Sequence, residues 1–168
     1  MDVDVAVLHE VTNEVVEAFG RLLPQLSSSA PPLDASALRA IVSGQASTVL
    51  IARAGGAIVG TLTVVIFPIP TGTRAWIEDV VVDESARGRQ FGGKRVGEAL
   101  TVEAIAIARQ AGARTIDLTT RPSRVAAGRL YERLGFEQRD SRVYRYAMSL
   151  PAPNSAEFGN GLKQPGDI

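Results

Sequence analysis

The chain has 168 residues, a size that suits one domain with a sizeable hydrophobic core. Its 18 basic and 18 acidic residues balance, which argues against a general nucleic-acid or membrane-surface binder, because such proteins usually carry a basic excess. The absence of cysteine excludes disulfides, thiolate nucleophiles and cysteine zinc sites, and a single histidine excludes a histidine-rich metal site. The first residues lack the pattern of a signal peptide. We therefore expect a cytoplasmic protein with no metal, no nucleic acid and no membrane among its partners.

Apolar periodicity predicts helices and strands in a mixed order along the chain. In chain order we expect a strand at 3–8, a helix at 13–23, a short helix from 34 or 36 to 44, strands at 48–54, 58–67 and 74–82, a helix at 92–111, a strand at 115–120, a helix at 123–134 and a strand at 143–149. An antiparallel meander followed by a βαβ crossover predicts an α/β (α+β) domain over residues 1–150. The Pro-, Gly- and Asn-rich segment 151–168 is predicted to be a disordered tail.

The strongest chemical signal lies between residues 82 and 94. The apolar run from Trp76 to Val82 is typical of a strand, and a loop containing Arg87-Gly88-x-x-x-Gly92-Gly93 follows it directly before the long helix. Glycines allow backbone N–H groups to converge on one point, and a helix N-terminus adds partial positive charge. This arrangement predicts a site for a phosphate-bearing ligand.

Two other interpretations of the loop remain open at this point. Gly88-x-x-x-x-Gly93-Lys94 matches most of a nucleotide P-loop, but Arg95 stands where that motif has the Ser or Thr that holds magnesium. The polar residues 83–87 also separate the strand from the first glycine, whereas a P-loop follows its strand almost directly. The loop could also be a plain turn whose glycines serve geometry alone.

A second motif lies on the helix predicted at 123–134. Its apolar face repeats at helical spacing and ends at Gly135, after which Phe136 can fold back on the last turn. Together the two motifs resemble the GCN5-related N-acetyltransferase (GNAT) family. The acyl-CoA loop pattern of that family, Arg/Gln-x-x-Gly-x-Gly/Ala, aligns on Arg87 to Gly92, and its later pattern, Ala-x-x-Leu-Tyr-x-x-x-Gly-Phe, aligns on Ala127 to Phe136 without a gap.

The resemblance covers roughly residues 3 to 149 and implies a fold, an activity and a donor site. The fold would be a mixed, mostly antiparallel sheet of six to seven strands with about four helices. The activity would be acetyl transfer from acetyl-CoA to a primary amine, directly in a ternary complex. Backbone and side-chain groups for the donor would come from Val80, Val81, Val82, Arg87, Gly88, Arg89, Gln90, Phe91, Gly92, Gly93, Lys94 and Arg124.

This chain departs from the family pattern at two donor positions. Gln90 stands where the family usually has the first Gly of Gly-x-Gly, and a positive φ there would cost roughly 1 kcal/mol or more. Arg124 stands where the family often has Asn, and an arginine there can still reach the CoA moiety through a charge-assisted hydrogen bond.

Acyl transfer requires a general acid for the leaving thiolate and a base for the attacking amine. We expect Tyr131 to be the acid, because a phenol is protonated at neutral pH and matches a thiolate in basicity. We expect Glu78 to be the base, since a regular strand would place its side chain on the same face as those of Val80 and Val82. Thr119 occupies a position where some members of the family carry a catalytic Glu.

The alternative to an enzyme is a non-catalytic acyl-CoA-binding regulatory domain of the same fold. The sequence does not select among small-molecule amines and peptides as the acceptor. A homodimer agrees with the resemblance, because members of the family often pair through the sheet or the C-terminal strands.

Overall fold

The computed structural model describes residues 2–148. The chain divides into two units, Met1–Glu137 and Gln138–Ile168, and every helix and strand reported below belongs to the first. Within the described residues no helix is long and apolar enough to cross a membrane. The predicted tail at 151–168 lies outside the described residues.

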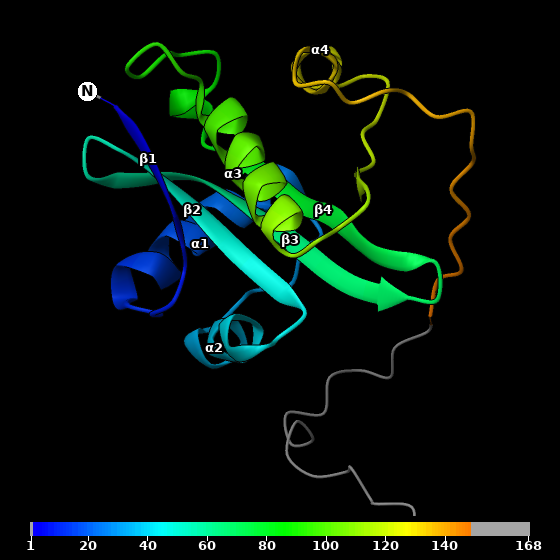
Figure 1. Ribbon diagram of the computed structural model, residues 1–168. Coiled ribbons are helices and arrows are strands. Elements are labelled where there is room, and N and C mark those ends of the chain that lie inside the picture. Colours follow the sequence, from blue (N-terminus) through cyan, green and yellow to red (C-terminus); the bar gives the residue numbers. More distant parts are fainter. Residues whose placement is uncertain (1, 149–168) are drawn as a thin grey trace, which may run out of the picture. The chain divides into compact units, whose positions relative to one another are not determined.

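The first unit contains one sheet of five strands in the order β1-β2-β3-β4-β5 (Figure 1). β5 runs parallel to β4, and the other neighbours are antiparallel. The elements are β1 (Val3–Val7), α1 (Asn13–Leu26), α2 (Ala35–Ser43), β2 (Ser47–Ala54), β3 (Ala57–Ile69), β4 (Gly72–Val82), the short 3-10 helix η1 (Glu84–Ala86), α3 (Val96–Gln110), β5 (Ile116–Asp117) and α4 (Val125–Arg133). The predicted α/β order and the mostly antiparallel sheet are confirmed.

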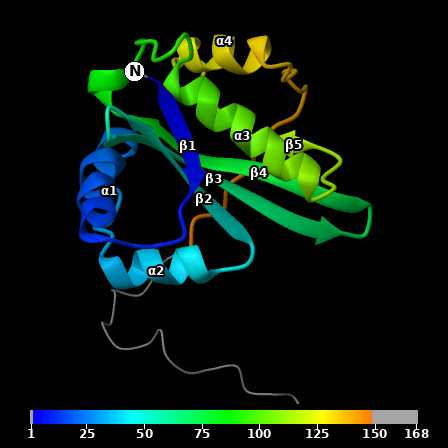
Figure 2. The same cartoon turned by 60° about the vertical axis from the view of Figure 1, so that its left-hand side comes forward.

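Two hydrophobic layers enclose the sheet. α3 lies over one face and buries Leu100 against Leu62, while α1 and α2 cover the other face with Leu22 and Leu38 (Figures 1 and 2). All four leucine side chains are at most 1% exposed. Burying a leucine contributes roughly 1.5–3 kcal/mol, so these layers hold the helices in fixed positions on the sheet.

The start of α3 lies unusually close to the sheet at Gly60. A Cβ at this position of β3 would lie 2.9 Å from Cγ1 of Val96 and 3.1 Å from the carbonyl oxygen of Val81. Any larger residue would therefore push α3 outward. Glycine at position 60 therefore allows the N-terminus of α3 to pack close to the end of β4.

Three predictions about the elements were wrong. The sheet has five strands in the described residues, whereas six to seven were predicted. Residues 143–148, which belong to the predicted last strand, form no strand, and residue 149 lies outside the described part. A strand requires a hydrogen-bonded neighbour, and no described residue pairs with this segment. The strand predicted at 115–120 forms ladder pairs only at Ile116 and Asp117. The helix predicted from 92 begins at Val96, since the two preceding glycines form a turn instead.

Candidate active site

A β-bulge interrupts β4 just before its end. Two residues of β4, Asp79 and Val80, lie opposite one residue of β3, and the pairing register shifts there. Asp79 has a φ of 50°, a conformation that no other non-glycine residue of the described chain adopts. Before the bulge Ile77 packs beneath α3, and after it Val80 does so. The bulge therefore shifts the alternation of side chains by one residue.

β4 and β5 separate beyond this point. Their ladder consists of two pairs, Ala75 with Ile116 and Trp76 with Asp117. The last residues of β4 have no strand beside them on that side within the described chain. The separation leaves a backbone edge at which a ligand could lie.

The direction of the hydrogen bonds shows which residue faces this gap. The amide of Asp83 donates to the carbonyl oxygen of Val59 in β3 at 2.8 Å. Bonding alternates along an antiparallel pair, so Val81 also bonds to β3 and the N–H group of Val82 points into the gap. The carbonyl oxygen of Val82 accepts from Nε of Arg87 at 2.8 Å.

The glycine-rich loop contains a tight turn that ends just before α3. The amide of Phe91 donates to the carbonyl oxygen of Lys94 at 2.8 Å, and that of Lys94 donates back at 3.1 Å. Gly92 and Gly93 have φ values of 57° and 80°, the left-handed conformation that this type of two-residue turn requires at both positions. Gln90 does not have a positive φ, so the strain considered for a non-glycine residue there does not occur.

Several backbone N–H groups of the loop and of the start of α3 have no partner among the described residues. The amides of Gly88, Gln90, Gly92 and Gly93 donate to no described residue. The first amides of α3 have no acceptor within the helix, and its N-cap residue, Arg95, provides no side-chain cap. An anion placed here would satisfy several donors at once and would meet the positive end of the helix dipole.

The loop is fixed to α1 through two residues. Asp83 accepts from Nε of Arg21 at 3.0 Å and from the hydroxyl of Ser85 at 2.6 Å. Oε1 of Gln25 accepts from the amide of Glu84 at 2.9 Å and from the guanidinium of Arg87 at 3.2 Å. These bonds hold the chain between β4 and Gly88 in place before any ligand arrives.

α4 carries Tyr131 next to the start of α3. A Cβ at Gly97 would lie 3.4 Å from Cδ2 of Leu130, so the two helices are in contact at this point. The ring of Tyr131 is 9% exposed and packs edge-on against Phe136 with the ring centroids 5.6 Å apart. Burial raises the pKa of the Tyr131 phenol, although Arg124 acts in the opposite direction. The phenol is therefore protonated throughout the neutral range.

A comparison with known proteins identifies the family. The sequence profile described as the Acetyltransferase (GNAT) family matches residues 9–136. The chain belongs to the GNAT acetyltransferase family. The match extends from before α1 to just past α4, so it includes the bulge, the glycine-rich loop and Tyr131. No match to a curated protein was found by sequence.

Solved structures of other GNAT acetyltransferases share the fold. A putative acetyltransferase from Agrobacterium tumefaciens str. C58 superposes with a TM-score of 0.72 at 25% identity, over 86% of this chain and 99% of that chain. A Trypanosoma brucei acetyltransferase has a TM-score of 0.68 at 28% identity, over 88% of this chain and 100% of that chain. The glucosamine-6-phosphate N-acetyltransferase of Arabidopsis thaliana, at 22% identity and a TM-score of 0.71 over 87% and 99%, supports the fold alone.

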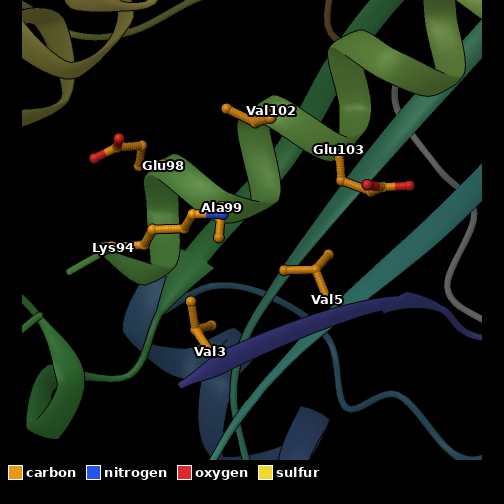
Figure 3. A pocket seen from close by; sticks show the side chains of 7 residues that line it. All are labelled: Val3, Val5, Lys94, Glu98, Ala99, Val102 and Glu103. Carbon is orange, nitrogen blue, oxygen red and sulfur yellow. The ribbon is translucent and has the colours of Figure 1, made fainter. Parts of the chain in front are cut away.

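The side chains of Arg87, Arg89 and Lys94 do not all point to the site that the GNAT motif implies for them. The guanidinium of Arg87 is directed back to Val82 and Gln25, and that of Arg89 lies 5.6 Å from the centre of the Phe91 ring. Lys94 lines a groove between β1 and α3 with a volume of about 250 Å³ (Figure 3). The structure thus leaves several loop amides without a described partner, whereas it turns these three cationic side chains toward other parts of the protein.

The premise used to choose Glu78 was wrong, because the bulge intervenes. Glu78 shares its face with Trp76, whose indole Nε1 donates to its carboxylate at 2.9 Å. Val80 and Val82 pack on the opposite face, beneath α3. Glu78 is exposed and lies on the face of the sheet opposite to the one that α3 covers.

Several important residues of this site were not found from the sequence. Arg21 and Gln25 of α1 carry no motif, and their contacts with the loop come from the packing of distant elements. The bulge is visible only in the structure, where the buried positions Ala75 and Ile77 are followed by Val80 rather than by residue 79. No group of three or more His, Asp or Glu side chains suited to a metal ion occurs in the part of the chain that the structure describes.

Removing the carboxylate of Asp83 is expected to destabilise the protein. Its bonds with Ser85 and Arg21 lower the pKa of this carboxyl from 3.8 to about 2, and the residue is 6% exposed. Because the pKa is lower in the folded state, the stabilisation is present above pH 4 and is lost as the pH falls through 2; it is worth about 2 kcal/mol. We expect Asp83→Asn to lower the free energy of unfolding by about this amount at pH 7, measured with urea.

The exposed Glu17 on α1 provides a matched control for that experiment. Glu17→Gln should leave the free energy of unfolding within about 0.5 kcal/mol of the wild type. Equal effects of the two substitutions, or an effect of Asp83→Asn that persists undiminished near pH 2, would contradict the role given to Asp83.

Proposed function

We propose that the protein is an N-acetyltransferase that moves the acetyl group of acetyl-CoA to a primary amine by direct transfer in a ternary complex. The observation that carries this proposal is the set of unpartnered amides in the loop between Gly88 and Gly93 and in the first turn of α3, which follow the end of β4. These donors suit a pyrophosphate, and the gap suits an extended acyl-pantetheine arm.

The donor would be held mainly by backbone groups. The loop from Gly88 to Gly93 and the start of α3 would receive the pyrophosphate, while the free N–H group of Val82 would bond to the pantetheine arm. Val80 would pack beside the arm, whereas Val81 supports the site from within the sheet. Arg124, exposed at the start of α4, is free to reach the CoA moiety.

The reaction would use two side chains, one as general acid and one as general base. The amine nitrogen attacks the thioester carbonyl carbon, the carbon–sulfur bond breaks, and the products are an acetamide and CoA. Tyr131 would give its proton to the leaving thiolate, and Glu78 would take the proton of the amine through water. Burial raises the pKa of the Tyr131 phenol, which keeps its proton available for the thiolate.

The chain has no cysteine to carry an acyl-enzyme intermediate, which favours direct transfer. The acceptor amine would approach the exposed face that contains Trp76 and Glu78. Small-molecule amines and peptide amines both remain candidates for the acceptor.

The proposal is tested by incubating the purified protein with acetyl-CoA and a panel of amines, with release of free thiol as the signal. We expect at least one amine to give thiol release with a matching acetamide product in the mass spectrum. Binding of acetyl-CoA without acetylation of any amine would instead support the regulatory acyl-CoA-binding alternative.

A further inference from the structure

The carboxylate of Asp2 lies directly against the glycine-rich loop. Asp2 precedes β1, and its side chain occupies the position that a Cβ on Gly92 would take; the Cγ of Asp2 is 2.8 Å from that position. The φ of 57° favours glycine at position 92, and the carboxylate of Asp2 lies in the space beside it. A residue far away in the sequence thus reaches the centre of the candidate donor site.

This position brings Asp2 close to the amides that would receive the donor. A Cβ lies about 2.5 Å from the amide nitrogen of its own residue, so the nearer Asp2 oxygen is within about 4–5 Å of the Gly92 nitrogen. Neither the amide of Gly92 nor that of Gly93 donates to the carboxylate. A phosphate oxygen accepted by these amides at about 3 Å would lie within about 8 Å of Asp2, inside the Debye length at physiological salt.

The cationic groups of the loop form no ion pair with this carboxylate in the described structure. No ion pair joins Asp2 to a described Lys or Arg. The side chain of Lys94 lies beside Val3 and Ala99 in the groove shown in Figure 3, and the guanidinium groups of Arg87 and Arg89 are directed to Val82 and Phe91. The negative charge of Asp2 therefore acts on whatever anion the loop receives.

We propose that Asp2 is a specificity-determining residue that limits the affinity of the loop for the phosphate groups of the donor. The inference rests on the proposed function, because it concerns the same donor site. Repulsion by Asp2 keeps phosphate contacts weak, so that discrimination among donors depends more on the acyl-pantetheine arm. The same charge would disfavour free nucleotides and other small phosphates at this loop.

The test compares Asp2→Asn with the wild type by calorimetric titration of acetyl-CoA and of acetyl-pantetheine, which lacks the pyrophosphate. We expect Asp2→Asn to bind acetyl-CoA about three- to tenfold more tightly at low salt and to show a smaller gain at 0.5 M salt. The affinity for acetyl-pantetheine should not change. Asp4→Asn is the matched control, since Asp4 lies two residues further along the chain, in β1, where it pairs with Arg53 of β2.

The outcomes separate this inference from the proposed function. Unchanged or weaker binding of acetyl-CoA by Asp2→Asn, with normal binding by the wild type, would overturn the inference and leave the proposed function standing. An equal gain for acetyl-pantetheine, or for Asp4→Asn, would also overturn it. Failure of the wild type to bind acetyl-CoA would instead contradict the proposed function itself.

Discussion

Replacing Tyr131 with phenylalanine is expected to lower kcat by about a hundredfold while leaving the affinity for acetyl-CoA unchanged. The substitution removes only the phenol oxygen, so the edge-on packing with Phe136 is retained. Loss of a general acid typically costs 10²–10⁴ in rate, and about 10² is the lower end of that range. Steady-state kinetics with the best amine and calorimetric titration with acetyl-CoA measure the two quantities separately.

The pH dependence and a second tyrosine sharpen this experiment. Burial raises the pKa of the Tyr131 phenol, so the wild-type kcat should show no loss attributable to its deprotonation below about pH 10. Tyr146→Phe is the matched control, because it removes the same oxygen from a tyrosine outside the unit that contains α3 and α4, and it should leave kcat unchanged. An unchanged kcat for Tyr131→Phe with chemistry rate-limiting would remove Tyr131 from the acid role.

Substituting Gly93 is expected to impair donor binding specifically. Its φ of 80° closes the turn that places the loop amides, and alanine is strained by about 1–2 kcal/mol in this conformation. Relaxation of that strain would move the amides of the loop and the start of α3. We expect Gly93→Ala to raise the Kd for acetyl-CoA at least about tenfold, which corresponds to about 1.4 kcal/mol.

The hairpin between β2 and β3 provides the control. Gly56 has a φ of 84°, and no atom lies within 4 Å of an added Cβ at either glycine. Gly56→Ala should therefore lower the stability by an amount similar to Gly93→Ala without changing the Kd. Equal Kd values for the two variants would show that the Gly92–Gly93 turn does not hold the donor.

The loop and the helix after it could be predicted because their signals are local. Glycines between a strand and an apolar helix indicate an anion-binding loop, although the helix was predicted from residue 92 and begins at Val96. The spacing of Leu130 and Tyr131 with Gly135 similarly fixed α4 and its end. The family match over residues 9–136 agrees with this interpretation of the two motifs.

The face of the sheet on which Glu78 lies could not be predicted in the same way. A bulge inverts the alternation of a strand, and its position depends on the pairing with β3 rather than on β4 alone. The contacts of Arg21 with Asp83 and of Asp2 with Gly92 join residues distant in sequence. Such contacts follow from tertiary packing, for which single-sequence patterns carry no signal.

Calorimetric titration of the wild-type protein with acetyl-CoA and CoA, with Mg-ATP in parallel, shows directly whether the glycine-rich loop holds an acyl-CoA donor. The free amides of the loop and of the start of α3 predict one saturable site for acetyl-CoA and CoA per chain and no comparable binding of Mg-ATP. Failure to bind either acetyl-CoA or CoA, or tight magnesium-dependent binding of ATP, would contradict the account of this site.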